Sequence, residues 1–476
     1  MPNLRLSSRP DSDTTWSTAA EIAAAVSDGA LTATAVIDQA LARIAKLNPV
    51  LNAFTAVTAT RAQSRAKAID SIRDRSGLPL VGVPFAVKNL FDVAGIVTTA
   101  GSKINRSDAS ADRDCPLIER LESSGAILVG ALNMGEYAYD FTGENVHDGP
   151  SRNPHDVSRM TGGSSGGSGG AVAGGMVPFA LGSDTNGSIR VPSSLCGIFG
   201  LKPTYGRLTR TRTFPFVSSL DHLGPFARSV RDLALTYDAM QGLAEGDGAC
   251  AERPIEPVTR ELDRGIGGLR IATAAGYFRN GAFPEAIEAL DGIAKALNAK
   301  EKVEFPEAAR ARAAAYLITA TEGAALHLDR LRARTADFDP AVRDRLLAGA
   351  MVPSALVAKA QIFRRWYRGR TLELFERVDA ILAPATPCTA PKIGQATFML
   401  DGRELPVRPN LGIYTQPISF IGLPVVAVPV PLKPLPIGVQ IIAPPWREDI
   451  ALRVAYALEQ MGIVATARPI GLEGTA

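Results

Sequence analysis

Serine and glycine are concentrated in two nearby stretches of the chain. Residues 161–170 read TGGSSGGSGG, and residues 182–190 read GSDTNGSIR. Glycine is needed where the backbone takes a positive φ or approaches a ligand closely, and serine supplies hydroxyl groups for nucleophilic attack or proton relay. This composition is typical of a rigid loop around a reaction centre. A flexible linker is the alternative, but apolar segments follow the run directly and favour a place inside a folded core.

Other chemistries fit these stretches less well. A phosphate-binding loop would need GxxxxGK[ST], or GxGxxG between a strand and a helix, and neither is present in that setting. Variants of the GxSxG nucleophile elbow occur within the run, but a Ser-His-Asp triad also needs a well-placed histidine. The chain has four histidines, each of which could be structural: His147, His155, His222 and His327.

A lysine could activate a serine if its amine were neutral. Lys88 ends the apolar segment VPFAVK, where an exposed charge is not expected. Burial among apolar groups and hydroxyls lowers the pKa of a lysine, which can then accept a proton through a bridging serine. The alternative is a lysine at a strand end that extends its amine into solvent.

Three segments of the sequence resemble the amidase signature family. They read GVPFAVKNLFDVAGIVTTAGS, GGSSGGSGGAVAGGMVPFALGSDTNGSIRVPSSLCGIFGLKPTYGR and LPIGVQII. The resemblance covers most of residues 16–240 and the part of the chain from Ile381 onward. It implies the amidase signature fold and an amidohydrolase that works through a serine acyl-enzyme.

The resemblance also implies a Ser-Ser-Lys triad. Lys88 in AVKN matches the catalytic base, Ser164 in GGSSGG the relay serine that follows a cis Gly163–Ser164 bond, and Ser188 in NGSIR the nucleophile. Ser188 follows Ser164 by 24 residues, which is the spacing of the family motif. Ser188 would attack an amide carbonyl, and Ser164 would pass its proton to Lys88.

An oxyanion hole is implied by the same resemblance. Its donors would be the backbone N–H groups of four consecutive residues: Thr185, Asn186, Gly187 and Ser188. Asn186 stands where the family commonly has glycine, and Asn89 where it has aspartate. Asparagine tolerates a positive φ, and its amide could face the substrate. The missing carboxylate at Asn89 should make Lys88 easier to neutralise.

A narrower resemblance concerns the substrate. AGSKINR, LGSDTNGSIRVP and TEGAALHLDRLRAR resemble the branch of the family that hydrolyses 1-carboxybiuret in cyanuric acid breakdown, a step of nitrogen catabolism. Such a small planar anion needs a guanidinium for its carboxylate and amide or hydroxyl groups for its ureido part. The candidates are Arg332, His327, Arg190 and Asn186. For Arg332 and His327 the alternative is a solvated helix face, and for Arg190 an ion pair that braces the loop.

Three other functions compete with this prediction. The chain could be the glutamine-dependent amidotransferase subunit that makes Gln-tRNA, an amidase for oxamate- or oxalurate-type substrates, or a catalytically dead scaffold subunit. The net charge of only +3 and the Asn186 variant disfavour the amidotransferase. All three triad positions are occupied, which disfavours the scaffold.

The elements that must position these residues alternate along the chain. Short apolar strand-like segments such as GAILVGAL, VPFALGSD and GVQIIAPP are separated by helical patterns such as that of residues 285–297. This order predicts an α/β fold with a large, mixed, mostly parallel sheet sandwiched between helices. We expect one domain over 1–476, with a helical insertion or cap over 251–375.

Composition limits the partners and the compartment. A net charge of +3 predicts no nucleic-acid groove, and the lack of 18 consecutive apolar residues predicts no membrane span. The first residues, MPNLRLSSRPDSDTTW, lack the apolar core of a secretory signal, and the four cysteines form no disulfide pattern, so a cytoplasmic location is predicted. No metal-ligand spacing or cofactor motif occurs. The resemblance implies a homodimer or heterotetramer and, as a partner, a small helical accessory subunit.

Overall fold

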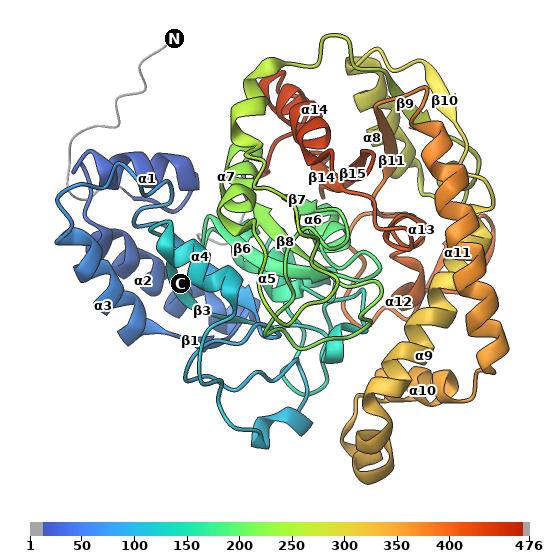
Figure 1. Ribbon diagram of the computed structural model, residues 1–476, viewed down its shortest axis with the longest axis horizontal. Helices are drawn as coiled ribbons and strands as arrows, with labels where there is room; N and C mark the ends of the chain where they lie inside the picture. The colour runs from blue at the N-terminus through green and yellow to red at the C-terminus, as the bar shows by residue number, and fades with distance from the viewer. Residues whose placement is uncertain (1–12, 470–476) are drawn as a thin grey trace.

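The computed structural model describes residues 13–469, with a large central sheet and helices around it (Figure 1). Residues 1–12 lie outside the described part. Most of the N-terminal segment MPNLRLSSRPDSDTTW, for which no secretory signal is predicted, falls there. The main sheet has 11 strands in the order β1-β3-β2-β6-β8-β7-β14-β15-β11-β9-β10. Its strands are β1 Phe54–Val57, β2 Pro84–Lys88, β3 Ile127–Leu132, β6 Phe179–Asp184, β7 Phe199–Lys202, β8 His222–Ala227, β9 Ile271–Ala274, β10 Glu301–Val303, β11 Ala380–Pro384, β14 Val425–Val430 and β15 Ile437–Ile442.

The α/β class and the large mixed sheet are confirmed, but parallel pairing does not dominate. Strands β3, β2 and β6 pair in parallel, as do β11, β9 and β10 at the other end. The pairs from β6 to β11 across the centre, and β1 with β3, are antiparallel. Continuous apolar runs are typical of any strand that is buried on both faces, so they did not reveal strand direction. Two small sheets pair β4 Arg152–Asn153 with β5 Asp156–Met160, and β12 Thr397–Leu400 with β13 Arg403–Pro406.

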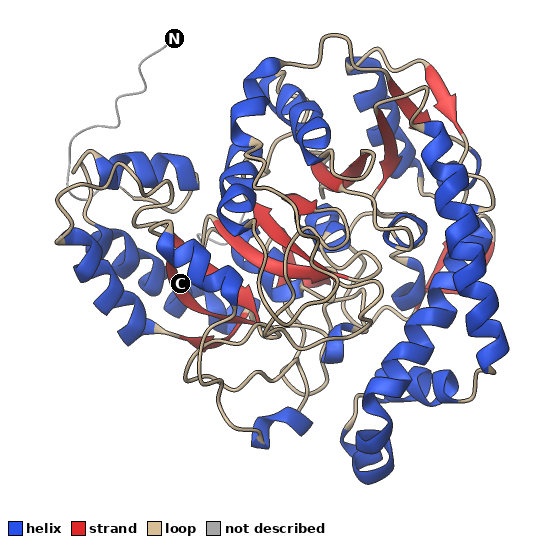
Figure 2. Cartoon of the chain, viewed as in Figure 1, coloured by secondary structure: helices blue, strands red, loops and turns tan. Residues whose placement is uncertain are grey.

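Helices lie on both sides of the sheet (Figure 2). Several begin at side-chain caps: Thr18 forms a capping box with Glu21 at α1, and Thr32 caps α2. The helices are α1 Ala19–Ser27, α2 Ala33–Leu51, α3 Ala59–Asp70, α4 Pro116–Ser123, α5 Gly166–Ala173, α6 Arg190–Cys196, α7 Val230–Met240, α8 Pro284–Ala296, α9 Ala308–Arg334, α10 Pro340–Ala350, α11 Ser354–Leu374, α12 Val407–Asn410, α13 Gln416–Ser419 and α14 Glu448–Gln460.

The glycine- and serine-rich run forms part of the core and is not a flexible linker. Its second half is α5, and every residue of this helix is buried. Glycine allows the close packing: a Cβ on Gly167 would lie 2.4 Å from the carbonyl oxygen of Ala53 and 2.6 Å from the backbone nitrogen of Asn133. The run therefore places its serines against the sheet.

The range 251–375, where a helical insertion was expected, is helical only in part. It contributes β9 and β10 to the edge of the main sheet, with α8 between them. Its remaining helices, α9 to α11, stand at one side of the molecule (Figure 1, right). The segment GLRIATA predicts the strand that is β9, but β10 was missed, because an Ala- and Arg-rich composition favours helix locally and pairing at a sheet edge is a tertiary effect.

No single helix among residues 13–469 is long and apolar enough to cross a membrane. The pair formed by α10 and α11, bent by 96°, meets that test only when both helices are taken together.

Candidate active site

Lys88 is buried among three serine hydroxyls. It is the last residue of β2, which lies between β3 and β6, and it has no solvent exposure. Its Nζ atom lies 2.7 Å from Ser164 Oγ, 2.8 Å from Ser183 Oγ and 3.0 Å from Ser165 Oγ. Within the described part of the chain, no carboxylate forms an ion pair with it. The amine is therefore held by neutral dipoles.

This environment brings Lys88 close to neutrality at physiological pH. Burial lowers the pKa of Lys88 to about 7, and attraction by nearby carboxylates, chiefly that of Asp184, opposes the shift only in part. An amine with this pKa is about half deprotonated at pH 7, so it can accept a proton in catalysis. The solvent-exposed alternative for Lys88 is excluded by its burial.

Ser164, the candidate relay serine, is held firmly against the sheet. The Gly163–Ser164 peptide bond is cis, as the resemblance implies. The carbonyl oxygen of Ser164 accepts a hydrogen bond from Gly135 N–H at 3.1 Å. Ser165 Oγ accepts one from the Ser183 N–H at 3.3 Å and donates one to the Ser183 carbonyl at 3.2 Å. The loop before α5 is thereby fixed to β6 beside Lys88.

Ser188 belongs to a turn, residues 185–188, whose backbone N–H groups have no protein partner in the described structure. Gly187 has φ 145°, and a Cβ there would lie 2.1 Å from Thr415 Oγ1, so only glycine fits. Thr415 Oγ1 donates to the Asn186 carbonyl at 2.7 Å and fixes the turn. The N–H groups of the turn remain available to a negatively charged oxygen.

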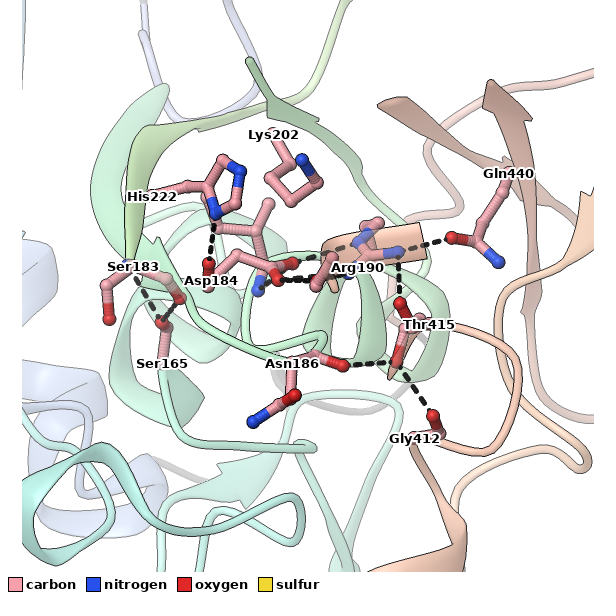
Figure 3. Close-up of polar contacts among 12 residues, drawn as sticks. Ser165, Ser183, Asp184, Asn186, Arg190, Lys202, His222, Gly412, Thr415 and Gln440 are labelled. Atoms are coloured by element: carbon pink, nitrogen blue, oxygen red, sulfur yellow. Dashed lines mark hydrogen bonds and ion pairs between the residues drawn. The ribbon is translucent and has the colours of Figure 1, made fainter. Parts of the chain in front are cut away.

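A buried ion pair supports this turn from behind. Arg190 is fully buried, and its Nε and Nη2 bind the two carboxylate oxygens of Asp184 at 2.9 and 3.0 Å (Figure 3). Burial opposes ionisation of Asp184, but the Arg190 guanidinium holds the pKa of this carboxyl well below its usual range. Arg190 Nη1 also donates to the Thr415 carbonyl at 3.0 Å and to Gln440 Oε1 at 2.6 Å.

Ser188 faces a small cavity next to the triad. The residue is only 3% exposed, and it lines the cavity with Thr185, Asn186 and Phe216. The cavity volume is about 20 Å³, which is of the order of one water-sized sphere. A ureido carboxylate therefore requires displacement of lining side chains. No hydrogen bond joins Ser188 Oγ to Ser164 Oγ among the described residues, and such contacts commonly tighten only when substrate binds.

The described residues contain no arrangement for a Ser-His-Asp triad. The Nδ1 atom of His222 lies 2.6 Å from the Leu220 carbonyl and 3.0 Å from that of Asp184, and burial lowers the pKa of His222 well below its usual value. His155 Nε2 lies 3.0 Å from the Cys196 carbonyl, and His147 Nε2 lies 2.9 Å from Glu136 Oε1. These three rings bind structural partners.

The predicted substrate-binding residues lie in different places. The Arg332 side chain is 71% exposed on α9, with Nη1 3.7 Å from Asp329, so the structure does not bring it to the cavity. His327 is completely buried against the ring of Tyr137, 4.0 Å between centroids, and does not line the cavity. The hydrogen bonds of Arg190 are made to protein groups. Only Asn186 of this set lines the cavity.

Arg345 is the cavity's guanidinium, and sequence reasoning missed it. It projects from α10, stacks over the Tyr139 ring at 3.8 Å, and donates through Nη2 to the Tyr139 carbonyl. Its Nη1 has no partner within residues 13–469. The segment VRDRLL contains two arginines, Arg343 and Arg345, on different faces of the helix, and periodicity alone does not show which of them meets the cavity.

Asn89 has a structural role beside the base. Its Nδ2 donates to Thr55 Oγ1 at 2.9 Å, and its Oδ1 accepts from Thr99 N–H at 3.1 Å. The side chain thus ties the loop after β2 to β1. Within the described range, no group of three His, Cys, Asp or Glu side chains is arranged to hold a metal ion.

Comparisons with known proteins agree with this geometry. The model of the Amidase family matches residues 35–452. The chain is 51% identical to AtzE, a subunit of the 1-carboxybiuret hydrolase of Pseudomonas sp. strain ADP, over 93% of this chain and 98% of that protein. It is 37% identical to a glutamyl-tRNA(Gln) amidotransferase subunit of Azotobacter vinelandii, over 93% of this chain and 97% of that one.

A solved structure is equally similar. It is described as a vestigial protein complex that reveals the evolutionary origins of an s-triazine catabolic enzyme. The two chains share 50% identity and a TM-score of 0.93, over 94% of this chain and 100% of the other.

The titration of Lys88 should control the reactivity of Ser188. With a pKa of about 7, the neutral fraction of the amine falls from about one half at pH 7 to about one tenth at pH 6 and about tenfold per unit below that, so labelling of Ser188 by a fluorophosphonate should slow in proportion. The labelling rate is measured by stopping the reaction at fixed times between pH 5.5 and 8.5 and quantifying labelled Ser188 by mass spectrometry. Lys88→Ala should label at least ~10²-fold more slowly, and Ser188→Ala should not label at this site. A rate independent of pH over this range would contradict the assignment of Lys88 as base.

The Asp184–Arg190 pair should stabilise the fold, unlike the exposed pair of Arg332. Arg190→Gln leaves the Asp184 carboxylate buried without its partner and should cost about 3–5 kcal/mol. The matched variant Arg332→Gln should change stability by less than about 0.5 kcal/mol. Thermal unfolding followed by circular dichroism compares the two. Equal midpoints for both variants would show that the buried pair is dispensable.

Proposed function

The chain belongs to the amidase family, and on this premise we propose that it removes the terminal amide nitrogen of a small ureido carboxylate, such as 1-carboxybiuret, as ammonia. The observation that carries the proposal is the buried Lys88 amine among the hydroxyls of Ser164, Ser165 and Ser183. An amine that is about half neutral at pH 7 and whose hydrogen bonds are made to hydroxyls alone is suited to accept a proton from a serine.

The first half of the reaction forms an acyl-enzyme. Ser188 Oγ attacks the terminal ureido carbonyl carbon, while its proton passes through Ser164 Oγ to Lys88 Nζ. The N–H groups of residues 185–188 bind the oxygen that becomes negative. The C–N bond then breaks, and the proton returns from Lys88 through Ser164 to the leaving nitrogen, which departs as ammonia.

Water completes the cycle. Lys88 takes a proton from the water through Ser164, and the hydroxide adds to the acyl carbon. The C–O bond to Ser188 breaks, and the proton is returned to Ser188 Oγ. The product carries a carboxylate in place of the terminal amide. The new carboxyl group loses its proton to solvent, and the other proton transfers return Lys88, Ser164 and Ser188 to their starting states.

Two cavity residues support a substrate that is both ureido and anionic. Arg345 offers an unpaired Nη1 to a carboxylate. Asn186 Nδ2 donates to Thr319 Oγ1 at 2.9 Å, and its Oδ1 is buried with no hydrogen-bond partner among the residues that the structure describes. An unsatisfied buried acceptor costs about 1–3 kcal/mol, and a substrate N–H would remove that cost. The cavity thus pairs one acceptor with one cation, which matches a ureido carboxylate.

The likeness to AtzE is the second support for this substrate. That relative belongs to a 1-carboxybiuret hydrolase, and a similar solved structure is a protein complex. We infer an assembly that is a homodimer or heterotetramer, with a small helical accessory subunit. The similarity to amidotransferase subunits keeps glutamine in the set of compounds to test.

Ammonia release should distinguish the candidate substrates. We expect kcat/KM for 1-carboxybiuret to exceed that for glutamine, oxamate and oxalurate. Arg345→Ala should raise KM at least tenfold with a smaller change in kcat, because a carboxylate contact binds ground state and transition state alike. Asn186→Gly should weaken binding of the ureido compound by about 1–2 kcal/mol.

Arg332→Ala is the control for these variants, and its kinetics should match those of the wild type. Assays with and without any small protein encoded beside the gene would detect an accessory subunit. Glutamine as the best substrate, or unchanged KM in Arg345→Ala, would contradict the proposal.

A further inference from the structure

A second concave site lies beside α11, away from the catalytic serines. Its volume is about 480 Å³, well above that of the catalytic cavity. One wall is α11, and the others come from the loops at Thr204–Tyr205 and Ile421–Gly422 and from Trp446. The lining side chains that carry charge all lie on α11: Arg364, Arg365 and Arg368. We call this site the α11 groove.

One of the three arginines is fixed in place. Arg364 Nε donates to the Phe420 carbonyl at 2.5 Å, and its Nη2 donates to the Ser219 carbonyl at 2.8 Å. Its guanidinium also lies 5.7 Å from the centroid of the Phe420 ring. Nη1 has no partner among residues 13–469. Arg364 is therefore a preorganised cation with one free donor group.

The other two arginines have no counter-charge. Arg365 and Arg368 are exposed, and within the described chain neither forms an ion pair. The helix as a whole has five Lys or Arg residues and one acid, Glu373, a net charge of +4 compared with +3 for the entire chain. Positive charge is thus concentrated on this helix and is balanced elsewhere by acids.

Three guanidiniums within about one helical turn repel one another. Burial is the main cause that lowers the pKa of Arg364; Tyr205 and Glu322 oppose this shift, and the charge of Arg368 adds to it. A bound anion would relieve this repulsion and make charge-assisted hydrogen bonds with groups that now have no partner. Guanidinium groups are well suited to phosphate and carboxylate, because their planar N–H pairs match two oxygens.

We propose that the α11 groove binds a small polyanion that carries two or more phosphate or carboxylate groups. The site differs from the catalytic one in residues and in charge. The guanidinium of the catalytic cavity is that of Arg345. The segment 416–422 contributes to both sites at different residues: Gln416 lines the cavity, and Ile421 and Gly422 line the groove. This inference does not depend on the identity of the amide substrate.

Isothermal titration calorimetry with pyrophosphate and, separately, citrate tests the proposal. The wild type should bind at least one of them at a single saturable site, more weakly as salt increases. The double variant Arg365→Ala/Arg368→Ala should bind at least tenfold more weakly, because two of three cations are lost. If pyrophosphate binds and citrate does not, phosphate is the preferred group; if only citrate binds, carboxylate is preferred.

Two controls make the result specific. Lys359→Ala/Arg370→Ala removes two charges from the same helix outside the groove and should bind within about twofold of the wild type. Arg345→Ala should also bind normally, since it alters only the catalytic cavity. The proposal is overturned if neither anion binds, if both double variants lose affinity equally, or if the loss occurs in Arg345→Ala. None of these results bears on amide hydrolysis, which is measured separately.

Discussion

The removal of Lys88 from water is the constraint on which the rest of the structure depends. A lysine in solvent keeps its proton at pH 7 and could not serve as a base. Here burial lowers its pKa to about 7, and three serine hydroxyls satisfy the amine without restoring its charge. A carboxylate at hydrogen-bond distance would have stabilised the ammonium form. The absence of such a contact from the described structure is therefore central to the chemistry.

The surrounding fold keeps charge near this amine but out of contact with it. Asp184 ends β6, directly after Ser183, yet its carboxylate is occupied by Arg190. The same ion pair braces the turn that carries Ser188, because Arg190 also holds the Thr415 carbonyl. The Asp184–Arg190 pair thus affects the surroundings of both Lys88 and Ser188. Because Arg190 binds the Asp184 carboxylate, Lys88 hydrogen-bonds only to neutral groups in the described structure, and the turn with the backbone N–H groups of residues 185–188 is held in place.

Sequence reasoning placed the candidate catalytic groups better than the candidate substrate-binding groups. Lys88 was a candidate because a charged residue at the end of an apolar strand is unusual, but the resemblance to the amidase signature family decided between this and a solvent-exposed lysine, and it also assigned Ser164 and Ser188. Arg345 could not be found, because several helices carry arginines and only tertiary packing shows which one meets the cavity. Arg332 was chosen for its neighbours in sequence and is exposed. Strand direction and the edge strand β10 depend on pairing between distant segments, which local patterns do not report.

The protonation state of Lys88 can be measured directly by NMR of protein labelled with nitrogen-15 at lysine Nζ. Lys88→Met and Lys202→Met variants would assign the two resonances, which is necessary because burial also lowers the pKa of Lys202 to about 7. The account predicts that the Lys88 signal titrates with a midpoint near pH 7. A midpoint near the ordinary lysine value of about 10.4 would contradict it, because the amine would then be charged whenever the enzyme acts.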